Sequence, residues 1–265
     1  MAVVNTEDLL AGSSVTTEDL LAGSTFEPAR AVADAVLYEG YLLYPYRRSS
    51  GKNRVRWQFG VLAPRRWVEA TGVAGNSVAG SADAWHQQTE CLLLVPDTAT
   101  VHVRLRFLQL QHRSVETRNP DGSFHQCDVL DVDGQRYLTF DEAVPREFDI
   151  VVPTRELRGD GHTATIGVPG GEDVEPLGEV GRLARRRWPL SATVRLSATP
   201  VDASPDVLKL RVVTENTADW VPAGASRSEA LRTSLVATHG AIRSLRPVTR
   251  SVITDDEGRA APHLF

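Results

Sequence analysis

The densest group of charged and aromatic residues in this sequence lies between Gly40 and Val68. This stretch contains seven basic and no acidic residues, with tyrosine, tryptophan and phenylalanine among them. Guanidinium and ammonium groups bind carboxylates or phosphates, and aromatic rings stack on bases or fill interface pockets. The basic residues that we predict to contact a partner here are Arg47, Arg48, Lys52, Arg54 and Arg56.

Three interpretations of this basic-aromatic segment (residues 40–68) remain open. Val55, Trp57, Phe59 and Val61 alternate with polar residues, which is typical of a strand with one buried face and a solvated charged face. The same charges would also suit an acidic protein partner or a single-stranded nucleic acid. The whole chain has a formal net charge of −5, whereas general nucleic-acid binders are usually basic. Nucleic acid is therefore the least favoured partner, and a protein partner is the preferred functional prediction.

A second set of residues has the donor atoms of a metal site. His125 and Cys127 are two positions apart, so on a strand they would share a face, and Glu90 with Cys91 could complete the site in space. No CxxC or HxxxH pair accompanies them, and a structural cysteine beside a surface histidine explains the pattern more simply. These four residues are weak metal-ligand candidates, and the sequence predicts no cofactor and no catalytic residue.

The N-terminal 24 residues contain a repeated peptide that could bind a partner. The octapeptide TEDLLAGS occurs at Thr6–Ser13 and again at Thr17–Ser24. One interpretation is a tandem duplication within a disordered acidic arm, because so short and polar a segment buries too little surface to become ordered. The other is a duplicated docking peptide that gains avidity from two copies. Its apolar anchors would be the two leucine pairs, Leu9 with Leu10 and Leu20 with Leu21.

The elements that would position these residues are mostly strands. Alternating apolar residues predict strands over 101–107, 192–198 and 208–212, and apolar runs predict strands over 89–95 and 148–152. The alternation slips by one at Phe107-Leu108, which is typical of a β-bulge. Asp133-Gly134 between two apolar runs predicts a hairpin, and residues 119–122 predict a turn. Residues 158–188 are rich in glycine, proline and charge, so we expect a long irregular excursion there.

Two helices are expected. Ser24 and Glu27, followed by Pro28, predict a capped helix over about 28–39, and Ser226 with Glu229 predicts a capping box for a second helix that continues to Gly240. Many strands, two helices and no crossover helix between successive strands indicate a mainly β fold. The expected fold is an antiparallel β-sandwich or barrel-like domain with two short helices.

We expect three regions in the chain. Residues 1–27 form a disordered acidic arm, residues 28–240 a β-rich globular domain, and residues 241–265 an irregular C-terminal tail. The N-terminal MAVVNTEDLL has no basic region before an apolar run, which argues against a signal peptide. The longest nearly continuous apolar run, Cys91–Val95, is too short to cross a bilayer. A cytoplasmic protein without membrane insertion is the resulting prediction.

Several stretches of the chain resemble a known family. The segment AVADAVLYE together with the basic-aromatic segment is similar to the N-terminal region of an uncharacterised family encoded beside bacterial nickel–iron uptake hydrogenases. Looser similarity extends through residues 88–91, 137–144, 212–219 and 234–239. Members of that family continue beyond the equivalent of His239, whereas this chain ends in IRSLRPVTRSVITDDEGRAAPHLF, so the chain resembles a shortened or frame-altered member.

The resemblance implies a relationship and no reaction, because the family has no established chemistry. What it implies is a non-enzymatic accessory or assembly protein whose partner is a hydrogenase subunit or maturation factor. The alternatives are a metal-binding protein or enzyme with a site assembled from distant residues, and a single-stranded nucleic-acid binder.

Overall fold

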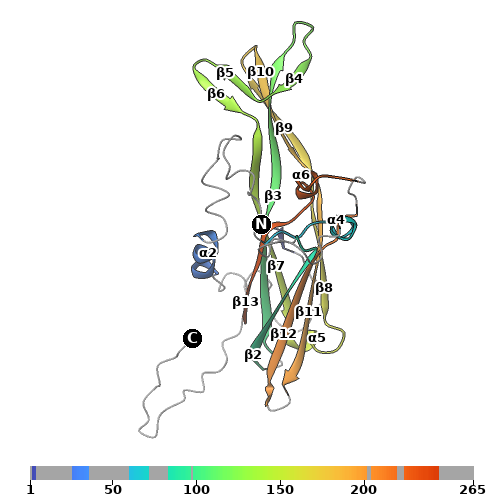
Figure 1. Cartoon of the computed structure of the whole chain (residues 1–265). Coiled ribbons are helices and arrows are strands. Elements are labelled where there is room, and N and C mark those ends of the chain that lie inside the picture. Colours follow the sequence, from blue (N-terminus) through green and yellow to red (C-terminus); the bar gives the residue numbers. More distant parts are fainter. Residues whose placement is uncertain are drawn as a thin grey trace.

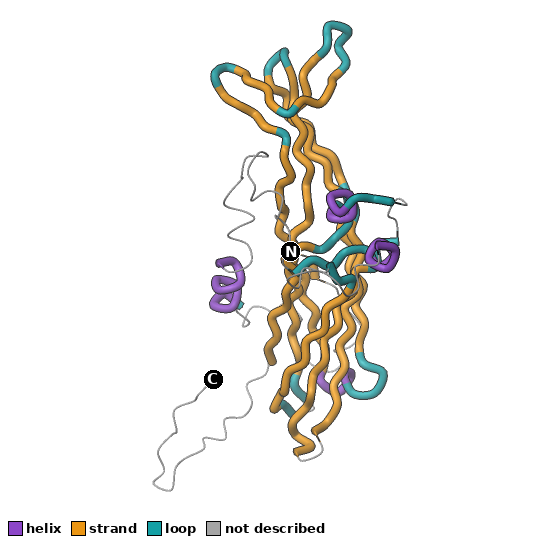
Figure 2. Tube along the Cα trace, in the orientation of Figure 1, coloured by secondary structure: helices purple, strands orange, loops and turns teal. Residues whose placement is uncertain are grey.

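The computed structural model describes residues 2–3, 26–35, 60–71, 83–96, 98–201, 204–219 and 224–244. These residues form a mainly β structure in which every strand pair except β1 with β7 is antiparallel, as the sequence predicts. Figures 1 and 2 show an elongated arrangement of the described strands, and Figure 1 places β5 and β6 at one end and the two facing sheets at the other.

The larger sheet has seven strands. Its central strand is β3, which is hydrogen-bonded to neighbours along both of its edges. The strands of this sheet are β1 (Ala2–Val3), β3 (Thr100–Arg118), β4 (Phe124–Cys127), β7 (Phe140–Pro153), β9 (Gly171–Leu177), β10 (Gly181–Arg187) and β13 (Val236–Ser244).

A four-stranded sheet and a hairpin complete the β structure. The four-stranded sheet has the order β2 (His86–Leu94), β12 (Ser204–Asn216), β11 (Leu190–Val201) and β8 (His162–Val168). The hairpin pairs β5 (Val129–Val132) with β6 (Gln135–Leu138). Asp133 and Gly134 at its turn have φ values of 50° and 77°, which confirms the predicted two-residue turn.

The main core lies between the two sheets. Val101, Val103, Leu105 and Phe107 of β3 face alternating apolar residues of β11 and β12, such as Val194 and Leu208. Each of these six side chains is at most 2% exposed. The period-two patterns over 101–107, 192–198 and 208–212 are thereby confirmed as the inward faces of a sandwich.

The apolar alternation shifts by one residue at Phe107-Leu108, but not because β3 contains the β-bulge that the sequence predicted. The register between β3 and β7 runs without interruption from Thr100 to Arg113, so β3 has no bulge. The extra residue lies in β13, where Ala237 and Thr238 together stand opposite Phe107. Leu108 is buried because the opposite face of β3 contacts a second core that includes Trp67 and Leu231.

The excursion predicted over residues 158–188 is wrong. This segment contains β8, β9 and β10, which belong to two different sheets. Cross-strand ion pairs stabilise β9 and β10 on the face they share, where Arg185 contacts Glu175 at 2.8 Å and Arg187 contacts Asp173 at 2.7 Å. Charge and proline are compatible with strands here because β9 is an edge strand whose first six residues are exposed.

Four short helices occur in the described ranges, two more than predicted: α2 (Glu27–Ala33), α4 (Arg65–Thr71), α5 (Thr154–Leu157) and α6 (Arg227–Leu231). The capping box of α6 is confirmed, since Ser226 and Glu229 bond reciprocally. Its predicted extent to Gly240 is wrong, because the chain turns after Leu231 and continues as β13.

Helix α2 begins differently from the prediction. Phe26 is its N-cap and makes no side-chain cap hydrogen bond, so the predicted Ser24 cap is wrong, while Pro28 does lie in the first turn. β13 runs past residue 240 as far as Ser244, and Ala2–Val3 pairs with Phe148 and Asp149 of β7. Of the predicted arm, residues 26 and 27 are also described and begin α2, and the rest of the arm and of the tail lies outside the described residues.

Gly60 provides a test of the β13 bulge. It has a φ of +58°, and a Cβ atom added to it would lie 2.9 Å from the backbone nitrogen of Thr238. We expect Gly60→Ala to lower the free energy of unfolding by about 2–4 kcal/mol, because it adds a backbone clash to the cost of a left-handed alanine. Chemical denaturation of both variants measures the difference from a control, Gly134→Ala, whose added Cβ meets nothing within 4 Å. Equal losses in the two variants would show that Gly60 does not fit against the bulge.

Candidate functional site

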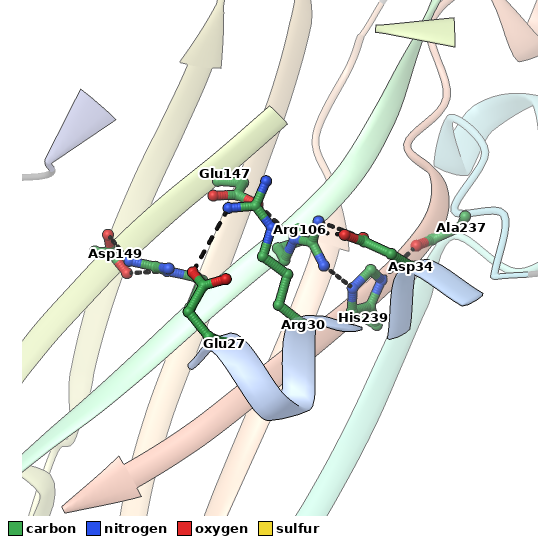
Figure 3. A network of polar contacts seen from close by, with 9 residues as sticks. Glu27, Arg30, Asp34, Arg106, Glu147, Asp149, Ala237 and His239 are labelled. Carbon is green, nitrogen blue, oxygen red and sulfur yellow. Dashed lines mark hydrogen bonds and ion pairs between the residues drawn. The ribbon is translucent and has the colours of Figure 1, made fainter. Parts of the chain in front are cut away.

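The most elaborate polar cluster in the described residues lies on the outer face of the larger sheet. We call it the charged network, and Figure 3 shows most of it. It joins residues of β3, β7, β13 and α2, which are far apart in the sequence. Its members are Glu27, Arg30, Asp34, His102, Arg104, Arg106, Glu147, Asp149 and His239.

Asp149 is the buried centre of one half of the charged network. The register places Asp149 of β7 directly opposite Arg104 of β3. Arg104 donates from Nε to Oδ1 at 2.7 Å and from Nη2 to Oδ2 at 2.9 Å, and Nε2 of His102 lies 2.6 Å from Oδ1. His102 and Asp149 have no measurable solvent exposure.

The pKa of Asp149 reports which force dominates at this carboxylate. Burial alone would raise this pKa, but the hydrogen bonds and charges of His102 and Arg104 outweigh it and lower the pKa from 3.8 to about 2. Asp149 is therefore ionised throughout the physiological pH range. A buried carboxylate with these partners holds strands and side chains in place, and its complete burial denies access to a substrate.

Arg106 is the centre of the other half. The register aligns it with Glu147 of β7 on one side and His239 of β13 on the other. Arg106 donates from Nε to Glu147 and from Nη2 to Asp34 of α2, each at 2.7 Å, and its Nη1 lies 3.4 Å from Nε2 of His239. One guanidinium group thus joins three strands and a helix.

His239 contributes as a neutral acceptor. Its Nδ1 lies 2.8 Å from the carbonyl oxygen of Ala237, so Nδ1 carries the proton and Nε2 can accept from Arg106. Burial lowers the pKa of His239; the bond to Ala237 opposes this shift, and the positive charge of Arg106 adds to it. The left-handed Ala237 of the β13 bulge brings its carbonyl oxygen within reach of the ring.

Helix α2 is attached to the sheet by charge and by one aromatic ring. None of its residues is buried, and Val32 is 65% exposed. Phe26, at its N-terminal end, is 6% exposed and packs edge-on against His102 with ring centroids 4.7 Å apart. At the other end, Asp34 binds Arg106, and Arg30 lies 3.8 Å from Glu147.

Helix α4 has the same length and the opposite mode of attachment. Trp67 and Val68 are buried in the second core, and the indole nitrogen of Trp67 donates to the carbonyl oxygen of Ala225. Its surface ion pair, Arg65 with Glu69, lies within the helix and does not anchor it. An isolated helix of this length is unstable in water, so each helix depends on its docking contacts, and those of α2 are largely ionic.

The predicted metal ligands do not come together. Glu90 and Cys91 lie on β2 of the four-stranded sheet, whereas His125 and Cys127 lie on β4 of the larger sheet. Within the part of the chain that the structure describes, no three His, Cys, Asp or Glu side chains are arranged as metal ligands. The structure therefore does not bring these four weak candidates together.

Each of the four has another role or environment. Glu90 binds Arg211 at 2.7 Å, His125 lies 2.7 Å from the side-chain oxygen of Asn119, and Cys127 contacts the backbone oxygen of Val115. Burial raises the pKa of the Cys91 thiol, which disfavours the thiolate that a metal requires.

The predicted partner-binding residues lie outside the described residues. These are Arg47, Arg48, Lys52, Arg54, Arg56, Leu9, Leu10, Leu20 and Leu21. Only the end of the basic-aromatic segment is described, and there Val61 is buried and Arg65 begins α4. Arg65 lies over the Trp85 ring at 4.5 Å.

The charged network itself was not predicted from the sequence. His102, Arg104 and Arg106 alternate with the apolar residues of β3 and would ordinarily face solvent. The available signal was a matching alternation on β7, where Glu147 and Asp149 are also two positions apart. Opposite charges at the same period on two paired strands are typical of a cross-strand ladder.

Comparisons with known proteins add no relative. No protein-family model and no curated protein matches this chain. Among the described residues, no helix combines the length and apolar character required to cross a membrane.

Asp149 gives a pH-dependent test of the charged network. Because its folded-state pKa of about 2 lies below the ordinary 3.8, the ionised carboxylate stabilises the fold above pH ~4. This contribution is lost as the pH falls toward 2. We expect Asp149→Asn to lower the free energy of unfolding by about 3–5 kcal/mol at neutral pH, since it leaves Arg104 and His102 without their anion.

Denaturation of both proteins between neutral and acidic pH measures this effect, and the gap between them should narrow as the pH approaches 2. The control is Asp131→Asn, which removes an exposed ion pair with Arg136 and should change stability little at any pH. A gap that does not depend on pH would contradict the assignment.

Asp34 tests how α2 is attached. We expect Asp34→Ala to speed amide exchange in residues 30–35 by about two- to fivefold, because a partly exposed ion pair contributes about 0.5–1 kcal/mol to docking. Hydrogen–deuterium exchange measures this, and the strands of the sandwich should be unaffected. The matched control is Glu69→Ala, which removes an ion pair of α4 but leaves Trp67 buried. Equal acceleration in both helices would indicate simple helix fraying.

Proposed function

We propose that this protein is a non-enzymatic accessory or assembly protein that binds a protein partner. The observation that carries the proposal is the attachment of α2, which has no buried residue and is held by the carboxylates and guanidinium groups of the charged network. Contacts of this kind are weakened by any competing charged surface. The helix can therefore move when a charged partner binds, while the apolar core of the sandwich stays intact.

The position of α2 in the chain supports the same proposal. The acidic residues of the predicted arm precede it, and the basic-aromatic segment follows it. A change in the docking of α2 would thus alter how two oppositely charged segments are presented. Arg47, Arg48, Lys52, Arg54 and Arg56 are the residues we propose to contact an acidic surface of the partner.

A subunit or maturation factor of a nickel–iron hydrogenase is the partner that the sequence resemblance suggests. A cytoplasmic location fits such a partner and stays part of the proposal. The alternative of a single-stranded nucleic-acid binder uses the same segment, and it differs in its salt dependence, which would be steep because phosphate neutralisation releases counterions.

Affinity purification tests the proposal. In a host that expresses both hydrogenase subunits, the tagged full-length chain should enrich a hydrogenase subunit or maturation factor. Replacing the five basic residues named above by serine should reduce that enrichment by about tenfold or more, because it removes charges from the contact itself.

The control removes the same number of positive charges from exposed parts of the sheets and should retain the partner. Its substitutions are Arg118→Ser, Arg136→Ser, Arg195→Ser, Lys209→Ser and Arg211→Ser. An equal loss of partner enrichment in both variants would show that only the net charge of the protein matters, and not the position of the five basic residues. Failure to enrich any subunit or maturation factor would overturn the hydrogenase assignment.

A further inference from the structure

Strand β8 is an edge strand without the usual protection against pairing. It is the last strand of the four-stranded sheet, and among the described residues no strand pairs with its outer edge; Figure 1 shows it beside β11. Its sequence, HTATIGV, contains no Asp, Glu, Lys, Arg or Pro. Its register with β11 is continuous, so no bulge turns the edge away. Charged residues, proline and β-bulges are the features with which proteins normally prevent an edge strand from pairing with another chain.

The other long edges of the described sheets are protected. β9 contains Glu172, Asp173, Glu175 and Pro176, which oppose the addition of another strand. β2 contains Glu90, and β13 contains a bulge and Arg243. Among the described residues, the outer edge of β7 is paired only where Ala2 and Val3 meet Phe148 and Asp149, but β7 contains charged residues and Pro145. The remaining edge strands have four residues or fewer. β8 differs from all of these in being long, uncharged and regular.

The two faces of β8 are suited to strand addition. Ala164, Ile166 and Val168 point into the sandwich core and are at most 5% exposed. Thr163, Thr165 and Gly167 are exposed on the outer face. A Cβ atom placed on Gly167 would meet nothing within 4 Å, so the outer face is open there.

We propose that a second copy of this chain pairs with β8, antiparallel and about a two-fold axis at Thr165. In this register Thr165 faces Thr165 of the other copy, Thr163 faces Gly167, and Ala164 faces Ile166. The outer row then contains a threonine pair, which is favourable across strands. The inner row pairs Ala164 with Ile166, and His162 at the end of the strand lies opposite Val168. No charges oppose each other, so the strand is complementary to itself.

The two four-stranded sheets would join into one continuous sheet across the axis. Self-pairing of β9 in the same way would oppose carboxylates, and Pro176 would remove a backbone donor. A seven-residue strand pair lies below the area of a stable dimer interface, so the dimer should be weak, with a dissociation constant of roughly micromolar or above.

Cysteine cross-linking tests the register. In a background with Cys91 and Cys127 replaced by alanine, Thr165→Cys should give a disulfide-linked dimer on mild oxidation, because directly opposed strand residues have Cα atoms about 4.5–5.5 Å apart. Thr163→Cys alone should cross-link poorly, and Thr163→Cys combined with Gly167→Cys should cross-link well.

Sedimentation velocity of the full chain tests the dimer itself. Its weight-average mass should rise with concentration, and Thr165→Lys should abolish the rise by placing two ammonium groups opposite each other. Thr193→Lys is the matched control, since Thr193 lies on β11 directly beside Thr165 but away from the axis, and it should still dimerise.

A monomer at all concentrations that also fails to cross-link would overturn the proposal. So would a dimer that Thr165→Lys leaves intact, because another surface would then mediate it. If the protein is a monomer and Thr165→Lys abolishes capture of a hydrogenase subunit, the strand that pairs with β8 belongs to that subunit and not to a second copy of this chain. The first two results do not bear on whether the basic-aromatic segment binds a partner, so the two proposals can fail separately.

Discussion

The carboxylate of Asp149 imposes the constraint on which the outer face of the larger sheet depends. β3 is paired along both edges, so its side chains can only project from its two faces, and one face already fills the sandwich core. The residues of the opposite face near Asp149 are ionisable and largely inaccessible to solvent, so each needs a partner. Asp149 satisfies His102 and Arg104, and Glu147 with Asp34 satisfies Arg106. Phe26 then covers His102, which places the start of α2.

In this protein, one set of interactions stabilises the fold and a different set determines the position of α2. The sandwich is stabilised by apolar burial between two sheets, and this burial does not involve α2. Buried ion pairs contribute little net stability compared with apolar replacements, although breaking one is costly. The charged network therefore acts mainly to specify where α2 lies. A helix positioned by charge between an acidic and a basic stretch of sequence suits a protein that responds to a charged partner.

The sequence predicted those parts of the fold in which local pattern and tertiary packing agree. The alternation of Val101 to Phe107, the Asp133-Gly134 turn and the Ser226 capping box are local signals, and all three are confirmed. β9 was missed because its first six residues are exposed, and β10 because its buried Leu183 and Ala184 are adjacent and stand among arginines, so no apolar period marks either strand. The charged network was missed because burial of Arg106 or Asp149 depends on a partner from another segment. The weak metal-ligand candidates Glu90 and His125 lie in different sheets, because the sequence pattern of a strand does not show which sheet the strand joins.

Helix α2 is held largely by charge and α4 by apolar burial, and salt concentration distinguishes these two kinds of attachment. Hydrogen–deuterium exchange of the unmodified protein would compare the two helices at about 0.05 M and about 1 M sodium chloride, a range over which the screening length falls from over 10 Å to about 3 Å. Amide exchange in residues 30–35 should become several-fold faster at high salt, while exchange in residues 67–71 should be unchanged or slower. Protection of α2 that does not change with salt would contradict its attachment by charge.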